Sequence, residues 1–189
     1  MTEPKPKTIA TLVRRPLLVA ALAASAVVPA PALAAYDLFL KLDGVEGEST
    51  YKGHEKWIHL FSYSTGFDNA GSVGKGGAAA GKATCSPFYA TKSVDKSSPP
   101  LVAAVMSGQR FQKAQIDVVR TGEFNATFLK YELSDVIVSS LQEAGAGGGA
   151  DVPQESVAMN FAKLNLTYYT QNSDGKLGAA ASAATNCGN

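Results

Sequence analysis

The chain has 189 residues, of which 46% are hydrophobic and 17% charged, and its formal net charge at pH 7 is +1. This composition suits one folded domain of ordinary size and excludes wholesale disorder. Without segment 1–34 the chain has 17 − 4 = 13 basic and 16 − 1 = 15 acidic residues, a net charge of −2. Such a nearly neutral body lacks the basic surface that binds nucleic acid or anionic lipid.

Residues 1–34 have the pattern of a cleavable secretory signal. Basic residues, including Arg14-Arg15, precede an apolar run at 17–28, and the small tripeptide Ala32-Leu33-Ala34 follows two prolines. The run is shorter than the ~20 residues with which a helix spans a bilayer. We therefore expect cleavage near Ala34, by the Sec or twin-arginine route, and a secreted or periplasmic protein without a membrane segment. A retained membrane anchor is the alternative.

We expect the mature chain to form one domain over 35–172. Two strands are predicted at its start. In 35–43 three leucines alternate with other residues, so one face of this strand is apolar. In 56–65 the apolar phase shifts after Leu60, which indicates a β-bulge. Beyond the bulge Ser62 and Ser64 share one face of the strand.

Residues 70–81 (AGSVGKGGAAAG) are small and rich in glycine. Ordering such a segment costs much conformational entropy and buries little surface. We therefore expect a long loop that is mobile or is ordered by another subunit. A strand pattern resumes over 84–93, where Pro87 indicates a sheet edge or a bulge.

One helix is predicted between a serine cap, Ser97 or Ser98, and Gly108, which can end it. Pro99-Pro100 suits the first turn. The apolar residues that follow have a 3/4 spacing: Leu101, Val102, Val105 and Met106.

Three long strands are predicted after the helix, over 111–121, 124–141 and 156–169, with a second flexible glycine loop at 145–149. The remainder, 173–189, is rich in Gly, Ala and Ser, and we expect a flexible tail. About six strands and one helix predict a mainly β fold, a barrel or sandwich of two sheets with one flanking α-helix.

The two cysteines, Cys85 and Cys187, would both enter an oxidising compartment after export. Paired thiols usually form disulfides there, and two cysteines allow one intrachain pairing. We expect a bond between the C-terminal tail and the segment that follows the first glycine-rich stretch. Two free thiols, or a bond between subunits, are the alternatives.

No cofactor, metal or catalytic site is predicted. The sequence GGAAAGK at 76–82 resembles a phosphate-binding loop, but Ala83 replaces the required Ser or Thr and no helix pattern follows. His54 and His59 are five residues apart, whereas the zinc motif H-E-x-x-H needs four on one helix face. The simplest interpretation makes His54 a loop residue and His59 a half-buried strand residue.

Several stretches in chain order resemble the Hcp family, whose members build the inner tube of type VI secretion. These stretches are YDLFLKLDGVEGES at 36–49, SYSTG at 62–66, GGAAAGKAT at 76–84, TKSVDKSSPPLVAAVMSGQ at 91–109 and QESVAMNFAKLNLTY at 154–168. The helix entry, Asp-Lys-Ser-Ser-Pro, is the most specific match. In SYSTG, Thr65 departs from the family by replacing its second aromatic residue.

The resemblance implies a two-sheet β-barrel with one flanking helix, homohexameric rings that stack into a tube, and effector proteins and other type VI components as partners. It places Ser64, and with it Ser62, on the surface that lines the water-filled lumen of the ring, where these residues would contact cargo. It also implies that the glycine-rich loop reaches a neighbouring subunit or ring, through candidate contact residues Gly71, Gly74, Gly76 and Gly77.

One feature departs from the family. Its tube subunits assemble in the cytoplasm and lack a cleavable signal, whereas 1–34 has the pattern of one. A structural ring subunit therefore competes with an exported binding module of the same fold that belongs to no tube. An enzyme or toxin built on His54, Glu55 and His59 is the third hypothesis.

Overall fold

A computed structural model describes residues 2, 36–74, 77–79, 81–122, 125–148, 152–172 and 174–187. The predicted secretory signal, except for Thr2, lies outside these residues, as does the candidate contact residue Gly76. The fold described below is that of residues 33–189, which form a unit separate from 1–32.

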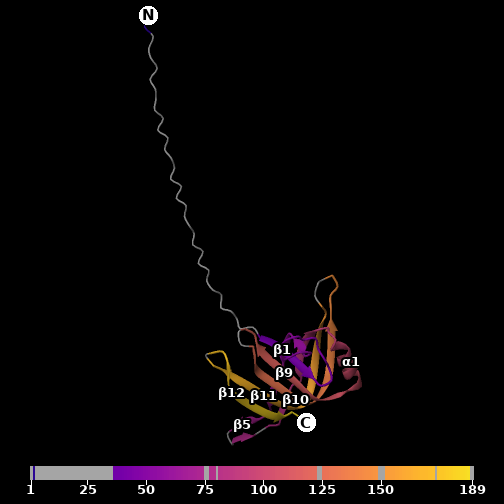
Figure 1. Ribbon diagram of the computed structural model, residues 1–189. Helices are drawn as coiled ribbons and strands as arrows, with labels where there is room; N and C mark the ends of the chain where they lie inside the picture. The colour runs from indigo at the N-terminus through magenta and orange to yellow at the C-terminus, as the bar shows by residue number, and fades with distance from the viewer. Residues whose placement is uncertain are drawn as a thin grey trace. The chain divides into compact units, whose positions relative to one another are not determined.

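The described part of this unit contains strands and one helix, and Figure 1 shows their arrangement. In chain order the elements are β1 Tyr36–Leu42, β2 Ile58–Leu60, β3 Ser62–Ser64, β4 Phe67–Asn69, β5 Ser72–Gly74, β6 Gly77–Ala79, β7 Ala83–Cys85, β8 Phe88–Ser93, α1 Ser98–Ser107, β9 Arg110–Arg120, β10 Ala126–Ala144, β11 Gln154–Gln171 and β12 Leu177–Asn186.

The main sheet curls until its two ends meet. Its strand order is β2-β1-β9-β10-β11-β8-β3, with β12 added beside β11. The end strands β2 and β3 are consecutive in the chain and are separated only by Phe61, whose N–H donates to the carbonyl of Thr91 in β8 (2.8 Å). The phase shift after Leu60 is therefore not the predicted β-bulge within one strand but a break between two short strands, of which β2 pairs with β1 and β3 pairs with β8. The predicted mainly β, two-layer fold with one helix is confirmed.

The long strands β10 and β11 pass through both layers. Along one edge β11 pairs first with β8, over 154–159, and then with β12, over 163–171. Asp135 of β10, with a φ of 55°, lies opposite the gap between these two pairings, and Asp is among the few residues that tolerate this conformation. A register shift between Val138 and Ser140 adds a β-bulge, which bends the ribbon further.

Apolar side chains from both layers and from α1 fill the space between them. The alternation that predicted the strands puts these residues on the inner faces. Tyr63 stacks on Phe88 with ring centroids 5.5 Å apart. Fully buried members of the core include Leu40, Leu42, Ile58, Phe88, Leu101, Ile116, Leu133, Val136 and Met159.

Helix α1 begins and ends where the sequence predicted, since Ser97 is its N-cap residue and Gly108 ends it with a φ of 65°. The predicted capping bond is absent, because the Ser97 hydroxyl donates to the Asp95 carboxylate and makes no cap hydrogen bond to the helix. The buried face is narrower than the spacing indicated. Leu101 is fully buried, but Val102 and Met106 are 45% and 82% exposed. Their spacing is helical, yet only one side of the helix lies against β10.

Two segments are more regular than the sequence indicated. In the expected loop 70–81, the described residues include β5 and β6, which pair as a hairpin. In the expected flexible tail 173–189, β12 forms a ladder with β11. Both corrections have one cause: backbone hydrogen bonds form these strands, whereas their small side chains give no apolar alternation.

Gly47 packs tightly against the backbone at the start of β2. It is buried, and a Cβ atom there would overlap the carbonyl oxygen of Trp57 and the backbone of Ile58. We expect Gly47→Ala to lower the free energy of unfolding by about 1–3 kcal/mol, because the two backbone segments must separate. Urea unfolding measures this change.

Gly147→Ala is the matched control, since a Cβ atom there meets nothing within 4 Å. Its effect should stay within about 0.5 kcal/mol. Equal effects of the two substitutions would show that close packing at Gly47 is not what requires glycine there.

Candidate self-association and cargo surfaces

The described residues within 67–85 form a projecting hairpin, here called the arm. β4 pairs with β7 and β5 pairs with β6, and both ladders are separate from the main sheet. Figure 1 shows β5 on the side of the molecule away from α1. Within the described residues the arm strands therefore pair only with each other, and their outer edges stay open to another chain.

The base of the arm is closed by a hydrogen bond between its two flanking residues and is tied to the body by a disulfide. The N–H of Ser86 donates to the carbonyl of Gly66 (2.9 Å). A disulfide joins Cys85 to Cys187 with 5.3 Å between their Cα atoms, the intrachain pairing expected from the sequence. Candidate contact residues Gly71, Gly74 and Gly77 all lie farther out along the arm.

Ser62 and Ser64 belong to a larger surface, here called the hydroxyl face. Their neighbours across the strands are Thr91 and Tyr89 of β8, and the Ser62 and Thr91 hydroxyl oxygens are 2.7 Å apart. The register continues these two rows over β11 and β10 through Ser156, Gln142, Ala158 and Ser140. The described part of this face carries hydroxyl, amide and methyl groups and no charged side chain, so it suits a wetted wall with little preference for a charge.

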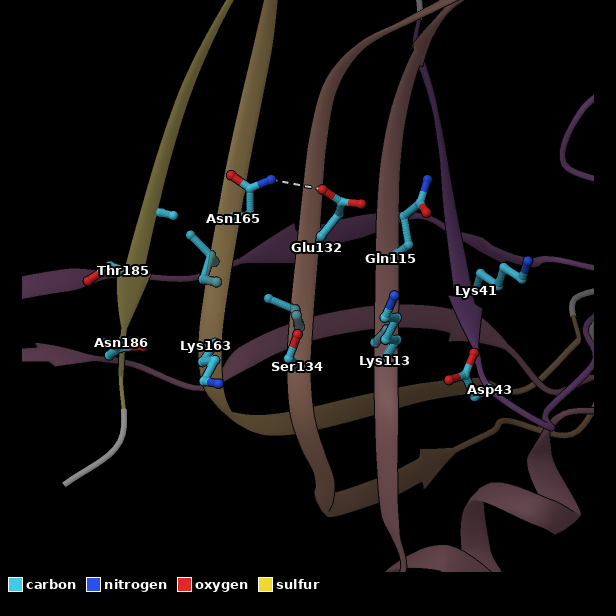
Figure 2. Close-up of a pocket in the computed structure, with 14 residues that line it drawn as sticks. Lys41, Asp43, Lys113, Gln115, Glu132, Ser134, Lys163, Asn165, Thr185 and Asn186 are labelled. Carbon is cyan, nitrogen blue, oxygen red and sulfur yellow. Dashed lines mark hydrogen bonds between the residues drawn. The ribbon is translucent and has the colours of Figure 1, made fainter.

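The other layer presents a charged face with a hollow of about 720 Å³. Figure 2 shows its side chains projecting from β1, β9, β10, β11 and β12 and from the residue that follows β1. Ser134 lies between Lys113 and Lys163 in the register, and one row away Asn165 donates to the Glu132 carboxylate (2.9 Å). The labelled lining residues are Lys41, Asp43, Lys113, Gln115, Glu132, Ser134, Lys163, Asn165, Thr185 and Asn186. An open hollow of this polarity suits a hydrated contact with another chain.

A cluster of buried charged side chains lies next to the start of α1. The Lys92 ammonium lies 2.6 Å from a Glu155 carboxylate oxygen, 2.9 Å from Asp95 and 3.1 Å from the Ser98 hydroxyl. That hydroxyl donates to Glu155 (2.9 Å) and accepts from the Asp95 N–H. Lys92 and Glu155 are 0% and 1% exposed. The cluster therefore ties the helix entry to β8 and β11.

A second small core lies on the outer side of β1. Phe39 is 2% exposed because Tyr51 and His54 cover it, with ring centroids 4.9 and 4.6 Å away. The His54 Nε2 atom lies 2.8 Å from the Asp117 carboxylate, and a carboxylate only accepts, so Nε2 carries the proton. His54 lies in a turn, as expected, but its side chain is buried.

The zinc interpretation finds no support in this geometry. His54 is enclosed by aromatic rings, whereas the His59 side chain is 49% exposed and lies 3.8 Å from Asp37. Among the residues that the structure describes, no three His, Cys, Asp or Glu side chains come close enough together to hold a metal ion.

Sequence reasoning missed the charged cluster and the partner of His54. One signal was available: Lys92 follows Phe88 and Ala90 in the inward phase of its strand, where a charge requires a buried partner. Nothing comparable points to Asp117, since it lies 63 residues from His54 in the chain.

The fold and surfaces define a class: a two-layer β-barrel-like protein with one flanking helix and a projecting hairpin arm. A solved structure described as a type six secretion system protein is similar to 80% of this chain and 96% of its own, with 33% identity and a TM-score of 0.77. A type VI secretion system effector from Yersinia pestis is similar over 79% and 99% of the two chains, with 27% identity and a TM-score of 0.63.

Residues 39–168 match the family model described as "Type VI secretion system effector, Hcp". Protein hcp1 of Pseudomonas aeruginosa is 36% identical over 143 residues, which are 75% of this chain and 88% of that protein. The chain therefore belongs to the Hcp family of type VI secretion tube proteins, as the sequence resemblance indicated. No helix within the described residues is long and apolar enough to cross a membrane.

Proposed function

We propose that this chain is a structural subunit that forms six-membered rings, which stack into a tube and carry or chaperone effector proteins. The arm is the observation that carries the proposal. Its strands pair only with one another in the described part of the chain, so their open edges can pair with an adjacent copy. Family membership supports the same reading.

In this ring the hydroxyl face lines the lumen. Ser62 and Ser64 are exposed and lie in rows of mostly polar, uncharged side chains over four strands, with the ring of Tyr89 among them. A surface of this kind holds water and offers weak hydrogen bonds to many proteins, which suits transient contact with cargo. Residues Ser62 and Ser64 are therefore the proposed cargo contacts, and the protein acts as a carrier and not as an enzyme.

The proposal also places the mature chain outside the cytoplasm. The predicted signal at 1–34 and the Cys85–Cys187 bond both fit an oxidising compartment. The second candidate function is an exported binding module of the same fold that belongs to no tube. That candidate predicts that the protein still accumulates outside the cytoplasm when the type VI machine is deleted, whereas full dependence on the machine excludes it.

Shortening the arm tests the ring proposal. A two-residue Asn-Gly turn can replace 71–81, since Asn69 and Ala83 are already paired across the arm. This change keeps Cys85 and its disulfide. We expect the variant to fold but to sediment as a monomer, because the contact with the adjacent copy is gone.

The matched control shortens the other glycine-rich segment, 145–151, to the same turn, and it should still form rings. Circular dichroism checks the fold of both variants. Rings of normal stability from the arm-shortened variant would contradict a role for the arm in assembly.

A further inference from the structure

The C-terminal strand β12 has few side-chain contacts that hold it. All but one of its residues are exposed, and it pairs only with β11 among the described strands. Cys187, directly after β12, is half-buried against the core, as is Cys85. Its N–H also donates to the carbonyl of Ala162 (2.7 Å), at the bend of β11. Besides the backbone ladder with β11, which runs along the whole strand, the strongest anchor of β12 is therefore at its cysteine end.

The same bond reaches the arm, because Cys85 is the last residue of β7, the returning strand of the arm, and pairs with Phe67. One covalent link thus holds the base of the arm and the end of β12 together. β12 also supplies one wall of the charged hollow through Thr185 and Asn186. Opening the bond would loosen two surfaces at once and leave the barrel core in place.

We propose that the Cys85–Cys187 disulfide is a redox latch on self-association: when closed, it holds the arm and β12 in the arrangement that a second copy of this chain binds. This inference rests on the proposed function, in which the arm contacts that copy. The latch reconciles an exported chain with ring formation, since subunits stay unlatched in a reducing cytoplasm and close after export.

The chemistry of the latch is thiol–disulfide exchange. A thiolate of a dithiol attacks one cysteine sulfur, and the other sulfur leaves as a thiolate that takes up a proton. The second thiol of the reagent then displaces the protein sulfur, so the reagent ends as a disulfide and the protein as two thiols. Two electrons pass to the protein, and exchange with a disulfide oxidant such as oxidised glutathione reverses the step.

Native mass spectrometry and hydrogen exchange on residues 35–189 test the latch, with dithiothreitol as the reductant. We expect rings from the oxidised protein, monomers from the reduced protein, and rings again after oxidation with glutathione disulfide. Reduction should speed hydrogen exchange in β12 by about tenfold or more, because the free energy needed to open this strand locally becomes smaller. The amides of β9 and β10 should keep their protection.

Two variants separate the latch from side effects of the reductant. The double variant Cys85→Ala/Cys187→Ala should behave in oxidising buffer as the reduced protein does. Ala181→Ser, an exposed change on β12 that keeps both cysteines, should respond to reductant as the unaltered protein does.

The outcomes distinguish failure of the latch from failure of the proposed function. Equal amounts of rings in both redox states would overturn the latch and leave the proposed function standing. Monomers in both states would contradict the proposed function, and the latch with it. Loss of protection throughout β9 and β10 on reduction would also overturn the latch, because the bond would then hold the whole fold and not two surfaces.

Discussion

Replacing Lys92 by alanine is expected to lower the free energy of unfolding by about 3–5 kcal/mol. The ammonium group is fully buried and forms ion pairs with two carboxylates, at 2.6 Å from Glu155 and 2.9 Å from Asp95. Without it the Glu155 carboxylate stays buried with only the Ser98 hydroxyl as a side-chain donor, and one of its oxygens already lacks a partner. Urea unfolding measures the loss.

Lys96→Ala is the matched control four residues away. Lys96 also pairs with a carboxylate, at 3.1 Å from Glu46, but both side chains are about half exposed. Exposed ion pairs contribute about 0–1 kcal/mol, so this variant should stay close to the unaltered protein. A Lys92→Ala variant no less stable than Lys96→Ala would show that the buried cluster does not hold the helix entry.

Phe39→Ala should lower the free energy of unfolding by a similar amount, through the side of β1 that faces away from the main core. Phe39 is 2% exposed and lies under Tyr51 and His54, outside the main core. Truncating a buried phenylalanine costs about 3–5 kcal/mol through lost burial and the cavity that remains. Thermal unfolding gives the size of the loss, and hydrogen exchange should show faster opening of the segment 49–57 that covers it.

Phe61→Ala is the control for that prediction, since Phe61 is 50% exposed at the break between β2 and β3. It should cost well under half as much as Phe39→Ala, because most of its surface already faces water. If the two variants lost the same stability, Phe39 would not be the centre of a second core.

The elements that alternate strongly were predictable from sequence. The leucines of β1 and the final glycine of α1 are local signals, and the structure places them as those signals indicate. The serine signal gave the start of α1 correctly, but the Ser97 side chain makes no cap hydrogen bond. β12 was not predictable, because its run of alanines has no inward face and only the ladder with β11 makes it a strand. The same holds for β5 and β6 in the arm.

The surfaces were predictable only in part. Ser62 and Ser64 follow from strand phase, but the neighbours that make them part of a face, Thr91 and Ser156, come from pairings of distant segments. Phe39 shows the limit clearly. Alternation put it on the polar side of its strand, and only the chain that folds over that side buries it.

Sedimentation equilibrium of the oxidised mature chain, residues 35–189, tests the central claim most directly. The claim is that an adjacent copy contacts the arm, whose strands pair only with one another in the described part of their own subunit. At micromolar concentration the account predicts a mass of six chains. A mass of one chain across the whole concentration range would contradict it.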